Sequence, residues 1–343
     1  PGGLAISNIG ACSIFAALSG SSPATCAAIG KMGIPEMRKH GYPEELATGS
    51  IAAGGTLGIL IPPSVTMIIY GISTGTSIGR LFIAGVLPGL MLTLFFIGWS
   101  MYYSLRSGTF AKGSRRHFSL REKIEQVPRV LPFLLIIAGI LYALYGGVAT
   151  PSEAAGVGAM LCFVLIAVIY GIRKPKQIWD ILSTSTRESV MIMMIIGAAE
   201  LLSYTLSSLF ITQSIAEWIA TVGVNRWLLL AIINIFLLIA GFFLPPVAVI
   251  LMTAPILLPI ILQAGFDPYW FAVVLTINME IGLITPPVGL NLYVIKGIVP
   301  DVGLPQILRG TIPFVLLMLL SIILLCVFPE IATWLPERLM GVS

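Results

Sequence analysis

AALSGSSPA at residues 16–24 and ILIPPSV at residues 59–65 are two short interruptions inside strongly apolar helical sequence. Serine and glycine interrupt the first stretch, and Pro62 with Pro63 interrupts the second. In a bilayer, a broken helix leaves backbone N–H and C=O groups that lipid cannot satisfy, so a break is tolerated only where it faces protein, water or an ion. The two stretches therefore predict broken helices around a binding site inside a membrane.

Composition places the whole chain in a membrane. Of the 343 residues, 57% are hydrophobic and 10% are charged, and the mean hydropathy is +1.00. No soluble domain of this size has such a composition. Several apolar runs reach the roughly 20 residues that a transmembrane helix needs, namely 81–103, 131–147, 154–171 and 306–328. We expect an all-α polytopic protein in a lipid bilayer.

The chemistry-bearing residues argue against an enzyme. The four cysteines stand singly in apolar segments and the two histidines lie in polar loops, so no metal-ligand spacing occurs. The sequence contains no HExxH or GxSxG motif and no phosphate-binding glycine loop. We therefore expect no catalysis, no ATP hydrolysis and no organic cofactor. The basic loops lack interleaved aromatic residues, so no nucleic-acid partner is expected either.

Positive charges are grouped in three loops, around residues 31–39, 106–129 and 173–176. The positive-inside rule makes these loops cytoplasmic. Within the second of these loops, residues 117–129 alternate charged and apolar residues, and this pattern and that of 175–188 predict helices that lie along the membrane surface. A separate span is expected at 189–210.

A second set of interrupted helices follows the first at a constant spacing of 224 residues. With this shift, Ala24, Pro35, Gly41, Gly58, Pro62 and Pro63 align with Ala248, Pro259, Gly265, Gly282, Pro286 and Pro287. The loop after the first hairpin is basic, whereas its counterpart, QAGFDPYW, has no Lys or Arg. The two copies are therefore expected to enter the membrane from opposite sides. Such inverted repeats, with broken helices near the midplane, are typical of secondary transporters.

The repeat predicts two parts of the chain. The first, residues 1–129, would hold a re-entrant hairpin at 3–32, a broken helix at 46–72 and the cytoplasmic basic segment 106–129. The second, residues 130–343, would hold scaffold helices at 130–210, a hairpin at 227–262, a broken helix at 268–298 and a last span at 306–328. By the same repeat logic, about 90 residues of the first copy are expected to be missing.

The ends of the broken helices carry the predicted chemistry. Free N–H groups at a helix N-terminus suit a carboxylate, and free carbonyls with Ser or Thr hydroxyls suit sodium. Ser22 is predicted as an N-cap followed by Pro23, and Thr285–Pro286 repeats that arrangement. Pro63–Ser64 would open a further half-helix. A proline kink without a ligand is an equal alternative for one break, but four related breaks favour a site.

Three acidic residues lie in or beside apolar segments. Glu280 would lie deep in the membrane, where an acid indicates function by default. It is either a proton or cation partner or a hydrogen-bonded structural acid. Glu200 is a weaker candidate of the same kind, and Glu153 is expected in the N-cap region of the TPSEA turn.

Several motifs together resemble one family. These are FAALSGSSPATCAAIGKMGIPEM, GTLGILIPPSVTMIIYGISTGTSIGRLFIAGVLPG, GGVATPSEAAGVGA, TAPILLPI and NMEIGLITPPVGLNLYVIKGI. They resemble the DctM-like large membrane subunit of tripartite ATP-independent periplasmic (TRAP) transporters, over essentially the whole chain. The resemblance implies an elevator-type, sodium-driven importer of organic anions such as C4-dicarboxylates or sialic acid, in the bacterial inner membrane. Its partners would be a small four-helix membrane subunit and a soluble periplasmic binding protein.

The resemblance also implies which residues form the site. Sodium is expected at Ser19, Gly20, Ser21, Gly58, Pro62, Gly282 and Thr285. The carboxylate substrate is expected at Ser21, Ser22, Pro63, Ser64, Thr285, Pro287, Gly289 and Asn291. An acidic residue often precedes proline at the second hairpin tip of this family, and Pro245 stands there instead. The alternative function is a binding-protein-independent dicarboxylate or citrate carrier of the same architecture.

Overall fold

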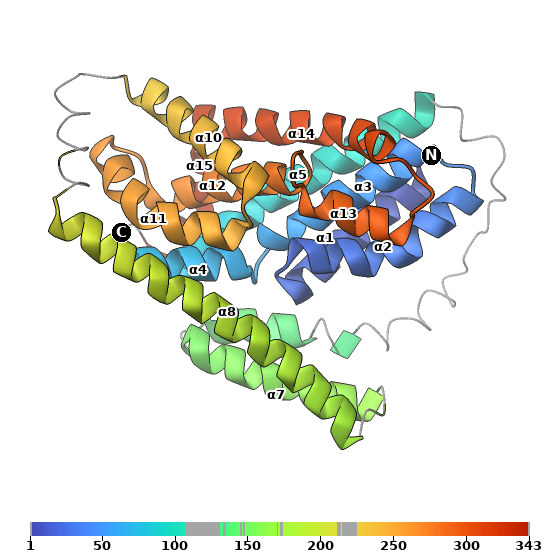
Figure 1. Ribbon diagram of the computed structural model, residues 1–343, viewed down its shortest axis with the longest axis horizontal. Coiled ribbons are helices and arrows are strands. Elements are labelled where there is room, and N and C mark those ends of the chain that lie inside the picture. The colour runs from blue at the N-terminus through green and yellow to red at the C-terminus, as the bar shows by residue number, and fades with distance from the viewer. Residues whose placement is uncertain are drawn as a thin grey trace. The chain divides into compact units, whose positions relative to one another are not determined.

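A computed structural model describes residues 2–106, 131–132, 135–144, 146, 148–169, 171, 174–210, 214 and 225–341. The chain divides into two compact units, one of residues 1–113 and 199–343 and one of residues 114–198 (Figure 1). Five helices in the described part are long and apolar enough to cross a membrane: α5 (Ile78–Arg106), α7 (Pro151–Ile169), α10 (Arg226–Phe243), α11 (Pro246–Gln263) and α14 (Leu304–Val327). The described residues thus confirm a helical protein with several spans.

The first unit contains two sets of helices, and the helices of each set follow one another in the same order. The first set is the hairpin of α1 (Gly3–Ser19) and α2 (Ser22–Lys39), then α3 (Glu44–Thr56), the 3-10 turn η1 (Leu57–Ile59), α4 (Val65–Thr74) and α5. The second set is the hairpin of α10 and α11, then α12 (Pro268–Leu283), α13 (Leu290–Ile298) and α14, followed by α15 (Glu330–Met340). Figure 1 shows the two hairpins at opposite ends of this unit.

The tip of the first hairpin is made by a glycine and a serine. Gly20 ends α1 in the left-handed conformation, with φ of 58°, and its N–H donates to the carbonyl of Ala16 at 2.9 Å. The N-cap of α2 is Ser21, so the predicted N-cap at Ser22 is wrong by one residue. Pro23 is then the second residue of the helix, where proline fits because an N–H would lack an intrahelical partner.

The second arm of this hairpin is longer than the predicted end at residue 32. Helix α2 continues through Pro35 to Lys39. Pro35 has no N–H to donate to the carbonyl of Lys31. Both residues are exposed, so this carbonyl lies at the surface. Arg38 and Lys39 in the last turn also favour the negative end of the helix dipole.

The N-cap arrangement predicted at Thr285–Pro286 is wrong. Helix α13 starts at Leu290 with Gly289 as its N-cap, because residues 285–288 form turns and Gly289 has a positive φ of 54°. At the first break the prediction is confirmed, since Ser64 is the N-cap of α4 and its hydroxyl accepts from the N–H of Met67 at 3.2 Å.

In the chain between the two sets, α8 (Pro175–Ser208) is one continuous helix. The expected separation into 175–188 and 189–210 is therefore wrong, because no proline and only Gly197 interrupts the sequence after Pro175. Helix α7 begins with a capping box, in which the backbone N–H of Thr150 donates to Glu153 at 2.8 Å. This confirms the predicted place of Glu153 in the N-cap region. Residues 107–129 and the side chain of Glu200 lie outside the described residues.

Helix α3 lies at the centre of the first unit, and every residue from Leu46 to Thr56 is buried. Its glycines allow three neighbouring helices to approach. A β-carbon at Gly49 would lie 2.1 Å from the carbonyl oxygen of Gly310 in α14. One at Gly54 would lie 2.9 Å from Cys12 Sγ in α1, and one at Gly55 would lie 2.7 Å from Cys26 Cβ in α2.

Helix α12 is the equivalent centre of the second set, with Trp270 to Leu283 buried without exception. The indole N–H of Trp270 donates to the carbonyl of Leu325 in α14 at 2.7 Å. Asn278 donates to Asn234 of α10, which gives two apolar helices a buried polar link. A buried helix of this kind is held by packing on all sides rather than by one apolar stripe.

The second arm of each hairpin packs on the short half-helix of the other set, α2 on α13 and α11 on α4. Along the first pair, a β-carbon at Gly30 would lie 2.8 Å from Ile298. At its end, Arg38 forms ion pairs with Asp301 and, at 2.8 Å, with Glu44. The bond from Arg38 holds the pKa of Asp301 below its ordinary value and raises the pKa of Arg38.

We predict that Gly49→Ala destabilises the protein, because the new methyl group would overlap the Gly310 carbonyl and force the backbones of α3 and α14 apart. Overpacking of this kind costs roughly 1–3 kcal/mol. The measurement is the thermal unfolding temperature in detergent. Gly98→Ala in α5 is the matched control, since nothing lies within 4 Å of a β-carbon there. Equal unfolding temperatures for the two variants would contradict the prediction.

Candidate functional site

The first hairpin tip meets the first helix break in a cluster of oxygen atoms. The hydroxyls of Ser19 and Thr25 are 2.8 Å apart, and both donate to the carbonyl of Ser21, at 3.2 and 2.9 Å. Gly58 lies against this cluster, since a β-carbon there would be 2.7 Å from the Ser21 oxygen and 2.9 Å from Thr25 Oγ1. A β-carbon at Gly20 would lie 3.0 Å from the Pro63 oxygen. We call this meeting point the first junction.

The first junction has the ligand chemistry of an alkali cation. Its polar atoms are hydroxyl and backbone carbonyl oxygens, and α1 ends beside it with its negative dipole end. In transporters with broken helices, such carbonyls and helix C-termini coordinate sodium. Among the described residues, no group of three or more His, Cys, Asp or Glu side chains could hold a metal ion.

Thr25 is a member of the first junction that the sequence analysis missed. It is fully buried, and its hydroxyl contacts both serines of the tip. The signal was available, because Thr25 follows Ser21 by four residues and so lies on the same face of the helix.

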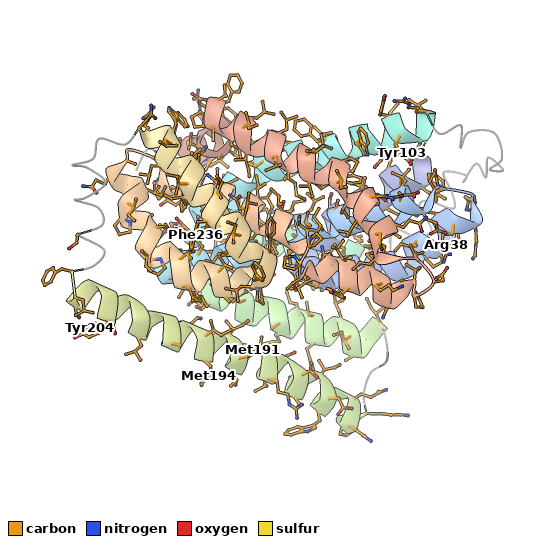
Figure 2. The ribbon with its side chains drawn as sticks, turned by 45° about the horizontal axis from the view of Figure 1, so that its top comes forward. Arg38, Tyr103, Met191, Met194, Tyr204 and Phe236 are labelled. Carbon is orange, nitrogen blue, oxygen red and sulfur yellow. The ribbon has the colours of Figure 1, made fainter. Side chains whose placement is uncertain are left out.

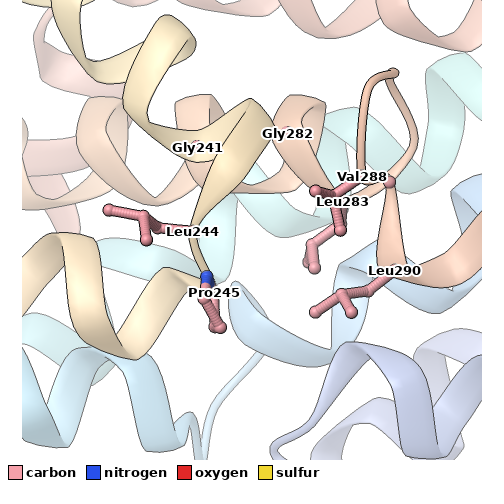
Figure 3. A pocket seen from close by; sticks show the side chains of 8 residues that line it. Gly241, Leu244, Pro245, Gly282, Leu283, Val288 and Leu290 are labelled. Atoms are coloured by element: carbon pink, nitrogen blue, oxygen red, sulfur yellow. The ribbon is translucent and has the colours of Figure 1, made fainter.

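The second hairpin tip meets the second helix break in the same way. A cavity of about 30 Å³ is bounded by Gly241, Leu244 and Pro245 of the tip and by Gly282, Leu283, Val288, Gly289 and Leu290 of the break (Figure 3). The N–H of Val288 donates to the carbonyl of Phe242 at 3.2 Å. We call this the second junction. All its side chains are apolar, so its polar groups belong to the backbone.

Of the site residues expected here, Gly282 and Gly289 line the cavity and Thr285 lies beside it. A β-carbon at Gly282 would be 2.4 Å from the Gly241 carbonyl oxygen, so only glycine permits this contact. The Thr285 hydroxyl donates within its own chain segment, to the carbonyl of Ile281. Pro287 is exposed and does not line the cavity.

Asn291 connects the two junctions. It is fully buried, and its amide group donates to Ser22 Oγ at 2.9 Å and to the Ala52 carbonyl at 3.0 Å. Asn291 Oδ1 has no hydrogen-bond partner among the described residues. Gly289 lines the second junction, and Ser22 is the next residue after Ser21 of the first junction. Residues 289–291 therefore bring the two junctions into one region of the unit.

Three other expected site residues form the first break itself. The Ser64 hydroxyl donates to the carbonyl of Ile59 while it caps α4, so it closes the first break. Pro62 is buried within the break, and Pro63 is half-buried with its carbonyl toward Gly20.

Glu280 is buried in α12, one turn before the second break. Neither of its carboxylate oxygens has a hydrogen-bond partner among the described residues. The alternative interpretation of Glu280, a structural acid held by hydrogen bonds, is therefore not supported by any partner in the described part of the chain. An isolated intramembrane acid of this kind keeps its functional interpretation.

Two helical hairpins whose tips meet two broken helices inside an apolar unit define a membrane transport protein. Comparison with known families agrees: residues 1–331 match the family described as tripartite ATP-independent periplasmic transporter, DctM component. The chain belongs to this family and is a TRAP large permease, a component of a transport system and not an enzyme.

Three relatives illustrate the similarity. The C4-dicarboxylate TRAP transporter large permease protein DctM of Pseudomonas aeruginosa is 41% identical, over 98% of this chain and 78% of that protein. The protein of the same description from Vibrio cholerae is 37% identical, over 99% of this chain and 79% of its own length. The sialic acid TRAP transporter large permease protein SiaM of Vibrio cholerae is 32% identical, over 99% and 79%.

We predict that Ser22→Ala and Asn291→Ala destabilise the protein non-additively, because they remove two ends of one buried hydrogen bond. Asn291→Ala should be the more costly change, by about 1–3 kcal/mol, since it also removes the buried hydrogen bond to the Ala52 carbonyl. Thermal unfolding of both single variants and the double variant measures this. Strict additivity would show that the bond from Asn291 to Ser22 contributes nothing.

Proposed function

We propose that this chain is the large membrane subunit of a sodium-driven importer of an organic anion. The observation that carries the proposal is the first junction, where hydroxyl and carbonyl oxygens of Ser19, Ser21 and Thr25 gather beside Gly58. Sodium bound there orders the tip of the first hairpin. The ordered tip presents the N-terminus of α2, whose first turn has no side-chain cap, to a carboxylate. Sodium and substrate then stabilise each other by linkage.

The two sets of elements are inverted repeats in this proposal. The same element order supports it, as do the hairpins at opposite ends of the first unit (Figure 1). The reciprocal packing of α2 on α13 and α11 on α4 supports it further, because a two-fold relation exchanges those pairs. On this basis the repeats are residues 1–129 and 130–343.

Transport then follows an elevator movement. Both hairpins and both broken helices belong to the first compact unit, so they are suited to move as one body that carries the junctions. The helices between residues 130 and 198, which belong to the second unit, would provide the fixed frame and would bind the small membrane subunit.

The substrate class follows from the site and from the relatives. Two of the compared relatives are named for C4-dicarboxylates and one for sialic acid, and all these compounds carry a carboxylate. The family description adds that the transporter is tripartite and periplasmic. A periplasmic binding protein and a small four-helix membrane subunit in the bacterial inner membrane complete the proposed system.

Uptake by the complete system tests the proposal. The chain is reconstituted into liposomes with its small subunit, and its binding protein is loaded with radiolabelled succinate or sialic acid. We expect uptake only with an inward sodium gradient and only with the binding protein present. Uptake that continues after the gradient is collapsed would exclude sodium coupling. Uptake of free substrate without the binding protein would favour the alternative, an independent dicarboxylate or citrate carrier.

We predict that Gly58→Ala raises the sodium concentration needed for half-maximal uptake at least about tenfold, equivalent to roughly 1.4 kcal/mol. The methyl group would press on the Ser21 carbonyl and the Thr25 hydroxyl and displace two of the expected sodium ligands. Gly98→Ala in open space is the matched control. A normal sodium dependence in Gly58→Ala, with normal protein yield, would remove the first junction from the mechanism.

A further inference from the structure

A larger cavity, of about 230 Å³, lies away from both junctions. It is formed by the first turn of α3, the last turns of α5 and the first turns of α14, and Glu45, Trp99, Tyr103, Arg309 and Phe314 are among the residues that line it. Phe314 packs edge-on against Phe96 of α5, with the ring centroids 5.3 Å apart, and closes the apolar side. The volume is several times the roughly 30 Å³ that one water molecule occupies in the liquid.

Two opposite charges line this cavity without meeting. Glu45 is half-buried and Arg309 is exposed, and neither forms an ion pair with the other or with any other described residue. The neighbouring Glu44, by contrast, is paired with Arg38. The backbones of α3 and α14 are in direct contact beside these two residues, since a β-carbon at Gly310 would lie 2.1 Å from the Glu45 carbonyl oxygen.

The aromatic residues of the cavity are of the kind found where a membrane meets water. Trp99 and Tyr103 are in the last turns of α5, which ends at Arg106, and Tyr103 lies at the same end of the unit as Arg38 (Figure 2). Trp and Tyr are enriched at the level of the lipid headgroups. Arg and Lys side chains in pockets between transmembrane helices at this level bind the phosphate groups of lipids.

The surface beyond the cavity is apolar in the direction of the membrane interior. Pro313 lines the cavity, and Leu316 and Leu320 follow it at about one helical turn each, 60% and 43% exposed. A molecule with a polar head in the cavity could therefore lay an acyl chain along α14.

We propose that this cavity binds the headgroup of a zwitterionic phospholipid. Arg309 binds the phosphate, since guanidinium groups donate paired hydrogen bonds to phosphate oxygens. Glu45 binds the amine, and Trp99 supplies an aromatic ring to the same cavity, where it can contact the cation. A ligand with both charges satisfies both side chains, whereas an anionic lipid would place a headgroup without a cation beside Glu45. The proposal does not depend on the sodium or substrate assignments.

Retention of lipid by the purified protein tests this proposal. The protein is reconstituted into nanodiscs that contain phosphatidylethanolamine and phosphatidylglycerol in equal amounts, then transferred to detergent and examined by native mass spectrometry. We expect one phosphatidylethanolamine to remain bound. Arg309→Gln should reduce its retention roughly tenfold. Glu45→Gln should remove the preference over phosphatidylglycerol. Lys31→Gln, which removes one exposed charge outside the cavity, is the control and should retain the lipid.

Three results would overturn the proposal. The first is equal retention in Arg309→Gln and Lys31→Gln, and the second is a preference for phosphatidylglycerol in the unchanged protein. The third is equal binding of soluble glycerophosphoethanolamine and of the lipid, which would assign the cavity to a soluble amino-phosphate. Thermal unfolding of each variant in detergent confirms that it is folded, so that a loss of lipid reports on the cavity.

Discussion

The close contact of α3 with its neighbours is the constraint on which the rest of the first unit depends. At Gly49, Gly54 and Gly55 there is no room for a β-carbon, so α14, α1 and α2 approach the backbone of α3 directly. Small residues allow such approach in membranes, where packing replaces the hydrophobic effect as the force between helices. Because α1 and α2 are held against α3, the tip that joins them is held against Gly58, just beyond the end of α3.

The two junctions solve one problem with different chemistry. Each leaves backbone groups without helical partners in an apolar unit, and each uses a glycine of the broken helix, Gly58 or Gly282, to bring the hairpin tip close. The first tip supplies hydroxyl groups, whereas the second has Leu244 and Pro245 and supplies backbone only. The sites are thus related in position but unequal in ligands.

Much of this arrangement could be predicted from the sequence, because the breaks are marked by residues that interrupt helices for known reasons. Serine, glycine and proline at the hairpin tip and at the helix breaks are visible without a structure. The first residues of α2 and α13 were harder to predict. Ser21 and Ser22 are equally good N-caps for α2, and the turn before α13 depends on the positive φ of Gly289. The contact of Asn291 with Ser22 joins residues 269 positions apart, and no local pattern could indicate it.

The second helix of each hairpin packs on the half-helix of the other set, and this has a consequence for biogenesis. Helix α2 packs on α13, and α4 packs on α11, so the earlier half of the chain lacks its partners until the later half has been made. During synthesis, α2 therefore enters the bilayer roughly 250 residues before α13, the helix that packs on it. At about 5–20 residues per second, this delay is roughly 10–50 seconds. The first set of helices therefore waits without its partners, and this unit can be assembled only after α13 has been inserted.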